Sequence, residues 1–247
     1  MSFDNGNVFT KENLDTYLSE LGKEYKKLGG KRMPAEIILI GGASIIANYG
    51  FRDMTTDIDA IIQATSMMKD AINHIGDRYG LPNGWINADF IKTSSYTSKL
   101  AEFSLYYRTF SGILSVRTVS GEYLIAMKLC AGRKYKNDLS DIVGILAEQE
   151  KSGSPISMAR IEKAVTDLYG GWEKIPADSK SFIDDVMNYP NLQELYEKTK
   201  SEEMQSKELL LNFENDYPGV TGTDNVDNIL KSLRERASSK ISIDSGP

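Results

Sequence analysis

Residues 37–62 read IILIGGASIIANYGFRDMTTDIDAII, and this segment gives the first indication of the architecture. The apolar run Ile37–Ile40 predicts a buried strand. Gly41-Gly42 predicts a turn, and residues 43–49 predict a short helix directly after it. The segment therefore begins as a strand, a tight turn and a helix, which is an arrangement that often binds phosphate groups.

Two aspartates enter a second strand at the end of the same segment. After a polar connection at residues 50–56, an apolar strand carries Asp57-Ile58-Asp59. Side chains alternate between the two faces of a strand, so Asp57 and Asp59 should point to the same side. Two anions on one face repel each other unless a cation lies between them. Magnesium, which proteins bind through one or two carboxylates plus substrate phosphates, is the expected ion, with manganese as the alternative.

The Gly-Gly helix start supplies the other half of this predicted site. The free N–H groups at Gly41 and Gly42 and the positive end of the helix dipole suit a phosphate. Ser44, in the first helical turn, either donates its hydroxyl to a phosphate or caps the helix. The two glycines alternatively make only a tight turn. Paired carboxylates beside a phosphate cradle indicate nucleotide chemistry.

Composition restricts the class of protein. The 247 residues suffice for one large domain or two modest ones, with 40% hydrophobic and 26% charged residues, as in ordinary soluble proteins. No apolar run approaches the roughly 20 residues that span a bilayer, and the N-terminus lacks the pattern of a signal peptide. Cys130 is the only cysteine, which excludes an internal disulfide and cysteine-rich zinc sites. We therefore expect a cytoplasmic protein.

Charge is distributed unevenly along the chain. The formal net charge is −6, yet the segment from Lys92 to Lys136 holds eight Lys and Arg residues against Glu102 and Glu122 only. This basic segment either attracts phosphate groups to one face or is an ordinary solvated surface. The two interpretations are equally compatible with the pattern.

The remaining patterns predict an α/β (α+β) protein with a small mixed sheet. Residues 1–120 should form the α/β core, residues 121–240 a helical part packed on it, and residues 241–247 a flexible tail. Residues 88–99 are polar and predict a loop. Alternating β-branched and aromatic residues predict a hairpin at 102–110 and 112–119. Helical periodicity and breakers predict helices at 10–28, 66–79, 123–131, 138–149, 156–169, 178–188, 191–213 and 224–237.

A second functional pattern follows the hairpin, in LIAMKLCAGRKYKNDLSDIVGIL at residues 124–146. Lys128 is the only charge in an apolar helix and is costly to bury unpaired, so it should face an anionic site; the alternative is a side chain that reaches the surface. Asp138 and Asp141, three residues apart, should face one way on a helix. The alternatives are an N-cap for Asp138 and a salt bridge from Asp141 to Arg133 or Lys134.

These motifs together resemble a known family. The pattern GG-A-S … R-x-x-T-x-D-I-D resembles the signature of the DNA polymerase β-like nucleotidyltransferase superfamily. Arg52 and Thr55-Thr56 before the aspartates, together with residues 124–146, make it more similar to the branch that contains the AbiEii-like nucleotidyltransferases of toxin–antitoxin systems. The gap between Gly42 and Asp57 is somewhat longer than in many members. The last 95 or so residues carry no motif of this family.

The resemblance implies a nucleotidyltransferase fold and a magnesium-dependent transfer of a nucleoside monophosphate from a nucleoside triphosphate, such as ATP, with release of pyrophosphate. The implied acceptor is an RNA, such as a tRNA end, or a protein hydroxyl, and the implied biological role is a toxin restrained by an antitoxin partner. It implies metal binding by Asp57 and Asp59, nucleotide binding by Gly41, Gly42, Ser44, Arg52, Thr56 and Lys128, and catalytic roles for Asp57, Asp59 and Lys128. The downstream catalytic aspartate of this branch corresponds to Asp138 or to Asp141, and spacing alone does not say which.

One element of the superfamily pattern is not evident in the sequence. Many members have a third carboxylate on a later strand, which acts as general base toward the acceptor. Asp89 and Glu102 are the two candidates, and neither fits a clear template. This departure supports a rival hypothesis of a catalytically silent binding or regulatory module with the same fold. A metal-binding α/β domain unrelated to nucleotides is a weaker alternative.

Overall fold

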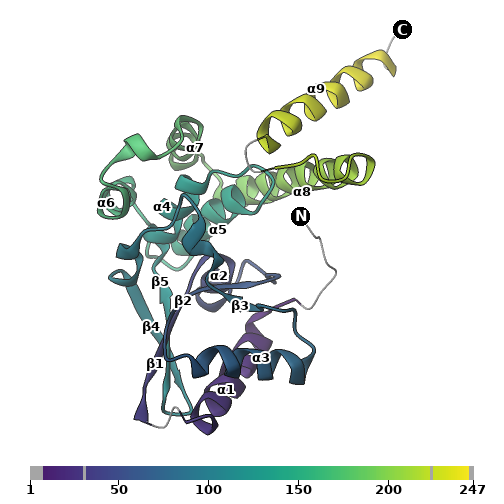
Figure 1. Ribbon diagram of the computed structural model, residues 1–247. Coiled ribbons are helices and arrows are strands. Elements are labelled where there is room, and N and C mark those ends of the chain that lie inside the picture. The colour runs from purple at the N-terminus through teal and green to yellow at the C-terminus, as the bar shows by residue number, and fades with distance from the viewer. Residues whose placement is uncertain (1–7, 30–31, 223–224, 245–247) are drawn as a thin grey trace.

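A mixed five-stranded β-sheet with helices on both faces forms the N-terminal part of the computed structural model (Figure 1). The structure describes residues 8–29, 32–222 and 225–244. The strand order is β3-β2-β1-β5-β4, in which β1 is antiparallel to β2 and parallel to β5. The strands are β1 (Ala35–Leu39), β2 (Ile58–Gln63), β3 (Ile86–Asn87), β4 (Ser104–Phe110) and β5 (Leu114–Val119).

Strand β1 is buried on both faces, which explains its continuous apolar sequence. Ile37 and Leu39 pack into the cluster formed with α1 (Lys11–Lys27) and α3 (Met67–Tyr79). Ile38 points the other way, into the larger cluster around the helices that follow the sheet. The alternation thus divides the core into one layer on each side of the sheet.

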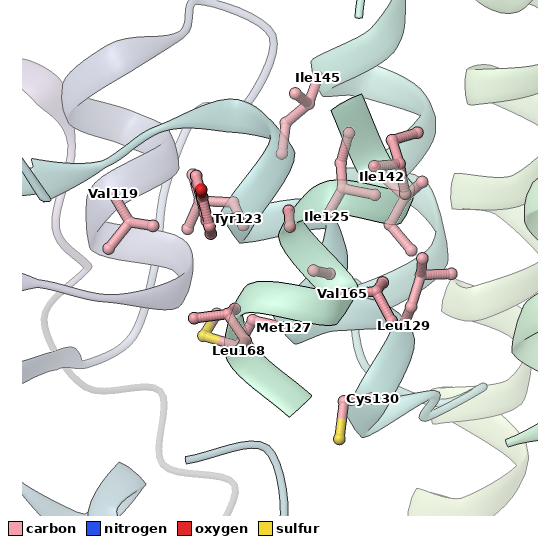
Figure 2. Packing of buried hydrophobic residues seen from close by; sticks show 14 of the residues in the cluster. Val119, Tyr123, Ile125, Met127, Leu129, Cys130, Ile142, Ile145, Val165 and Leu168 are labelled. Carbon is pink, nitrogen blue, oxygen red and sulfur yellow. The ribbon is translucent and has the colours of Figure 1, made fainter. Parts of the chain in front are cut away.

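The larger core layer is built around α4 (Gly121–Ala131), which is buried on nearly every side. Figure 2 shows Ile125 and Leu129 of α4 close to Ile142 and to Val165. These partners belong to α5 (Asp138–Lys151) and α6 (Met158–Tyr169), respectively. Because α4 has apolar residues on all sides, it serves as a central helix between the sheet and the C-terminal helices.

The C-terminal helices continue from this layer (Figure 1). They are α7 (Ala177–Met187), α8 (Leu192–Asp216) and α9 (Val226–Asp244). Helix α8 packs along α5, whereas α9 packs on α8 through a small cluster that includes Leu210 and Leu230. None of the described helices combines the length and the apolar character needed to cross a membrane.

The predicted fold class is confirmed by the mixed sheet and the helical C-terminal half. Some boundaries differ from the expectation. The polar segment at 88–99 contains 3-10 turns at Asp89–Lys92 and Ser98–Ala101, and α9 extends into the segment expected as a tail. Residues 245–247 of that tail lie outside the described residues.

Candidate functional site

A cavity of about 270 Å³ lies between the end of β1 and the start of α2 (Gly41–Asn48). The start of β2, the last turns of α4 and the start of α5 also line it. Residues from several distant segments meet there. Its walls include Ile40, Gly41, Gly42, Arg52, Thr55, Asp57, Asp59, Asp89, Phe90, Met127, Lys128, Arg133, Lys136 and Asp138. Most of the residues singled out in the sequence therefore lie in one place.

The two aspartates before and within β2 line the same cavity. Ile58 and Ala60 are buried in the cluster with α1 and α3, so Asp59 between them points to the opposite face. Burial, and next the charge of Asp57, raise the pKa of the Asp59 carboxyl to about 6. The pair therefore carries unfavourable negative charge that a cation would relieve.

The donor set fits magnesium better than a metal held by protein alone. Among the described residues there is no group of three or more His, Cys, Asp or Glu side chains placed to hold a metal ion. Magnesium commonly takes only one or two carboxylates and completes its coordination with water and phosphate oxygens. Asp57 and Asp59 match that requirement.

The Gly-Gly turn places backbone beside the cavity. Gly41 has a φ of +54°, a left-handed conformation that glycine adopts without strain. At Gly42 a Cβ would lie 2.6 Å from Thr55 Oγ1 and 2.9 Å from Arg52 Nη2, so a side chain does not fit. Both glycines line the cavity, and the first N–H groups of α2 have no acceptor in a preceding turn. This start of α2 can receive an anion.

Ser44 and Thr56 are not brought to the cavity, contrary to the sequence-based expectation. Ser44 is fully buried, and its hydroxyl accepts a 2.9 Å hydrogen bond from the Val119 N–H, which joins α2 to the end of β5. Thr56 is exposed and is not part of the cavity lining. Thr55 takes that place instead: it is buried, lines the cavity, and exchanges two backbone hydrogen bonds with Phe9.

Lys128 occupies a buried position between two carboxylates. Its Nζ lies 2.8 Å from Asp138 Oδ1 and 2.8 Å from Asp141 Oδ2, and the residue is only 7% exposed. The alternative of a lysine that reaches the surface is therefore wrong. Burial opposes the charge, but the two carboxylates outweigh it and raise the pKa of Lys128. Lys128 is held in its charged form at the cavity wall.

Two arginines extend this network on either side. Arg52 Nη1 lies 2.5 Å from Asp141 Oδ2, and Arg133 Nε lies 2.7 Å from Asp138 Oδ2. Asp141 thus pairs with Lys128 and Arg52, and the alternative of a salt bridge to Arg133 or Lys134 is wrong. Burial opposes ionisation of Asp138, but Lys128 and then Arg133 outweigh it and lower its pKa. Three cations and two anions leave the network with one net positive charge.

The cationic members of the network, rather than Asp141, face the cavity. Lys136 adds a further positive charge, which the carboxylates of Asp138, Asp57 and Asp59 attract. Burial, and next the charge of Arg133, lower the pKa of Lys136. The cavity lining therefore contains a positive part, from Lys128 to Lys136, and a negative part at Asp57 and Asp59.

The two candidates for the third carboxylate differ in position. Asp89 lines the cavity, because β3 runs parallel to β2 with Asn87 opposite Asp59 and Asp89 follows two residues later. Its carboxylate is 72% exposed and pairs with Lys92 at 2.7 Å. Glu102 is exposed and is not part of the cavity lining. Geometry favours Asp89 of the two.

Sequence reasoning missed a buried acid on α8. Glu203 is 4% exposed and accepts hydrogen bonds from the N–H groups of Leu139 and Ser140, at 2.8 and 3.3 Å, and from the Ser140 hydroxyl. It therefore caps the start of α5, the helix that carries Asp138 and Asp141. The spacing of Asp138 and Asp141 predicted that they face one way on a helix, but nothing near Glu203 indicated its contact with that helix.

A family model described as "nucleotidyltransferase of unknown function (DUF6036)" matches residues 16–167 of the chain. The matched range contains the whole cavity lining and ends within α6. Helices α7, α8 and α9 follow it. Neither the curated proteins nor the solved structures contain a significant match.

Proposed function

Because the chain belongs to this family of nucleotidyltransferases of unknown function, we propose that it is a magnesium-dependent enzyme that transfers a nucleoside monophosphate from a nucleoside triphosphate to a hydroxyl group. One observation carries the proposal: a single cavity joins the Asp57/Asp59 pair, the glycine start of α2, and a positive wall. This combination suits a triphosphate, whose negative charge needs both hydrogen-bond donors and cations.

Backbone N–H groups and basic side chains would bind the nucleotide together. The N–H groups at Gly41 and Gly42 would bind phosphate oxygens at the start of α2. Lys128, Arg133 and Lys136, which line the same cavity, would attract the negative charge of the triphosphate. Asp138 and Asp141 contribute indirectly, since they keep Lys128 charged and fixed in one orientation. Arg52 acts in the same way through Asp141 and also packs over Gly42.

The reaction would be an in-line substitution at the α-phosphorus. The acceptor hydroxyl oxygen forms a bond to this phosphorus while the bond from the α-phosphorus to the bridging oxygen breaks, and pyrophosphate leaves. Asp57 and Asp59 would hold magnesium, which supplies charge neutralisation and alignment of the phosphates. Asp89 is the candidate that accepts the hydroxyl proton. The positive wall stabilises the charge that develops on the leaving pyrophosphate.

The acceptor and the biological role rest on less direct arguments. Lys128, Arg133 and Lys136 bring part of the basic segment to the cavity, which favours a polyanionic acceptor such as RNA over a protein hydroxyl. A toxin role with an antitoxin partner is a proposal from the resemblance to the AbiEii-like branch. The family match covers only the nucleotidyltransferase part of that expectation.

A catalytically silent module is the second candidate, and one observation favours it. Asp89, the best candidate for the base, is largely exposed and is paired with Lys92. A protein of this kind would bind the nucleotide and magnesium without transferring anything. The intact Asp57/Asp59 pair and the charged Lys128 argue for the enzyme.

Both candidates are tested by incubating the protein with each α-labelled nucleoside triphosphate, magnesium, and a mixture of tRNA and cell proteins. The enzyme predicts label transfer that Asp57→Ala abolishes. Asp53→Ala is the matched control, because Asp53 is an exposed acid of the same connection and is not part of the cavity lining. Binding without transfer supports the silent module, and absence of magnesium-dependent binding contradicts both.

A further inference from the structure

The start of α5 is capped by a side chain from a distant helix. Glu203 of α8 directs Oε1 at the Leu139 N–H and Oε2 at the N–H and hydroxyl of Ser140. The three donors belong to the first turn of α5, where N–H groups have no acceptor within the helix. Glu203 is almost completely buried, so these contacts are shielded from water.

The local candidates for this capping role are used elsewhere. Asn137 occupies the N-cap position, but its side chain makes no capping hydrogen bond. The carboxylates of Asp138 and Asp141 are directed at Lys128, Arg133 and Arg52. The acidic side chains of the first turn of α5 are therefore engaged in ion pairs. Its N–H groups need an acceptor from outside the helix, and Glu203 provides it.

Helix α8 also holds the connection that precedes the paired aspartates. The Tyr196 hydroxyl donates a 3.0 Å hydrogen bond to the Phe51 carbonyl oxygen, and the two rings pack edge to face. Phe51 directly precedes Arg52, which is the partner of Asp141. Helix α8 therefore contacts both of the segments that carry the Arg52–Asp141 ion pair.

From these contacts we propose that Glu203 is a positioning residue of the site. By fixing the first turn of α5, it sets the places of Asp138 and Asp141 and, through them, the orientation of Lys128. Helix α8 lies beyond the family match at residues 16–167, so a helix outside the matched range supports the elements that form the cavity wall. The catalytic part of this inference rests on the proposed nucleotidyltransferase function.

The test compares Glu203→Ala, Glu203→Gln and Glu202→Ala in the full chain. Glu202 is the matched control, because it neighbours Glu203 on α8 but is exposed. Hydrogen–deuterium exchange of residues 138–141 reports the cap directly. Because Glu203→Ala removes the acceptor of these N–H groups, it should speed this exchange about tenfold. Glu203→Gln keeps an acceptor oxygen and should restore slow exchange, whereas Glu202→Ala should leave it unchanged.

Nucleotide transfer under saturating acceptor gives the functional readout. Glu203→Ala should lower kcat about tenfold with a smaller change in KM for the nucleotide, because a misplaced Lys128 stabilises the departing pyrophosphate less well. Glu203→Gln should recover most of kcat. Circular dichroism and urea unfolding confirm that each variant is folded before it is assayed.

The outcomes separate this inference from the proposed function. Absence of transfer by the unaltered protein contradicts the proposed function, and exchange at residues 138–141 then still decides whether Glu203 orders α5. Equal exchange in Glu203→Ala and Glu202→Ala overturns the inference. It is also overturned if an active protein keeps its kcat in Glu203→Ala, or if Glu203→Gln is as impaired as Glu203→Ala.

Discussion

The Nζ atom of Lys128 lies 2.8 Å from Oδ1 of Asp138, and both residues are almost completely buried. An ion pair in this position is stable only when each group keeps its partner, since an unpaired buried charge carries a large desolvation cost. Asp141 and Arg133 complete the contacts of this pair. The pair therefore links the stability of the fold to the charge of the cavity wall.

The first prediction concerns this link. Asp138→Asn should lower the free energy of unfolding by about 3–5 kcal/mol, because it leaves Lys128 and Arg133 with one anion fewer in a buried site. Urea unfolding measures the change. Asp178→Asn is the control: it makes the same chemical change in an exposed surface pair with Lys134, where the free energy of unfolding should change little. Equal losses in the two variants would contradict a special role of the buried pair.

Metal dependence gives the second prediction. Asp57→Asn and Asp59→Asn should each remove most of the magnesium-dependent part of nucleotide binding, since the two carboxylates are the protein ligands proposed for the ion. Titration calorimetry with a non-hydrolysable triphosphate, with and without magnesium, measures this part. Asp53→Asn, at an exposed position, should bind like the unaltered protein. Retained magnesium dependence in both cavity variants would exclude the proposed metal site.

The third prediction tests the close packing at the start of α2. Gly42→Ala should displace Arg52 or Thr55, because the new Cβ would lie within 3 Å of a side-chain atom of each. Displacing Arg52 would also disturb its ion pair with Asp141. We expect a loss of about 1–3 kcal/mol in stability, typical of overpacking, and weaker nucleotide binding.

Gly50→Ala is the control for this change. Gly50 has no positive φ, and the nearest atom to an added Cβ is Glu148 Oε1 at 4.0 Å. The variant should keep both nucleotide affinity and stability, as measured by the same calorimetry and urea unfolding. A Gly42→Ala protein that matches Gly50→Ala in both measurements would show that the backbone at Gly42 has room the structure does not indicate.

The parts of the site that the sequence predicted correctly depend on local periodicity. The same-side placement of Asp57 and Asp59 follows from strand alternation, which the burial of Ile58 and Ala60 fixes. The apolar surroundings of Lys128 likewise indicated an anionic neighbour. Such rules need only the neighbouring residues, so they hold without knowledge of the tertiary arrangement.

The errors and omissions involve contacts between distant segments. Ser44 was expected at a phosphate, but the rotation of α2 relative to the sheet turns it toward Val119, 75 residues away. Arg52 meets Asp141 across 89 residues, and Glu203 meets Leu139 across 64. No local pattern encodes these pairings, because they depend on how α2, α5 and α8 pack after the elements have formed.

The last prediction uses the pH dependence of the Glu203 cap. Burial, opposed by the hydrogen bonds from Ser140 and Leu139, raises the pKa of Glu203 from 4.5 to about 7, and Asp141 adds to the rise. Between pH 4.5 and about pH 7, the Glu203 carboxyl is therefore mostly protonated in the folded protein and mostly ionised in the unfolded chain. Stability from this group is therefore complete below about pH 4.5 and is lost as the pH rises to about 7, at up to about 1.4 kcal/mol per unit.

Glu203→Gln lacks this titration and isolates its contribution. The difference in unfolding free energy between the unaltered protein and Glu203→Gln should shift by about 2–3 kcal/mol in favour of Glu203→Gln from pH 5 to pH 8. Urea unfolding at several pH values measures the shift. Glu202→Gln, at an exposed neighbour, should follow the unaltered protein throughout. If Glu203→Gln shows the same pH profile as the unaltered protein, Glu203 is ionised in the folded state over this whole range and caps α5 as a carboxylate.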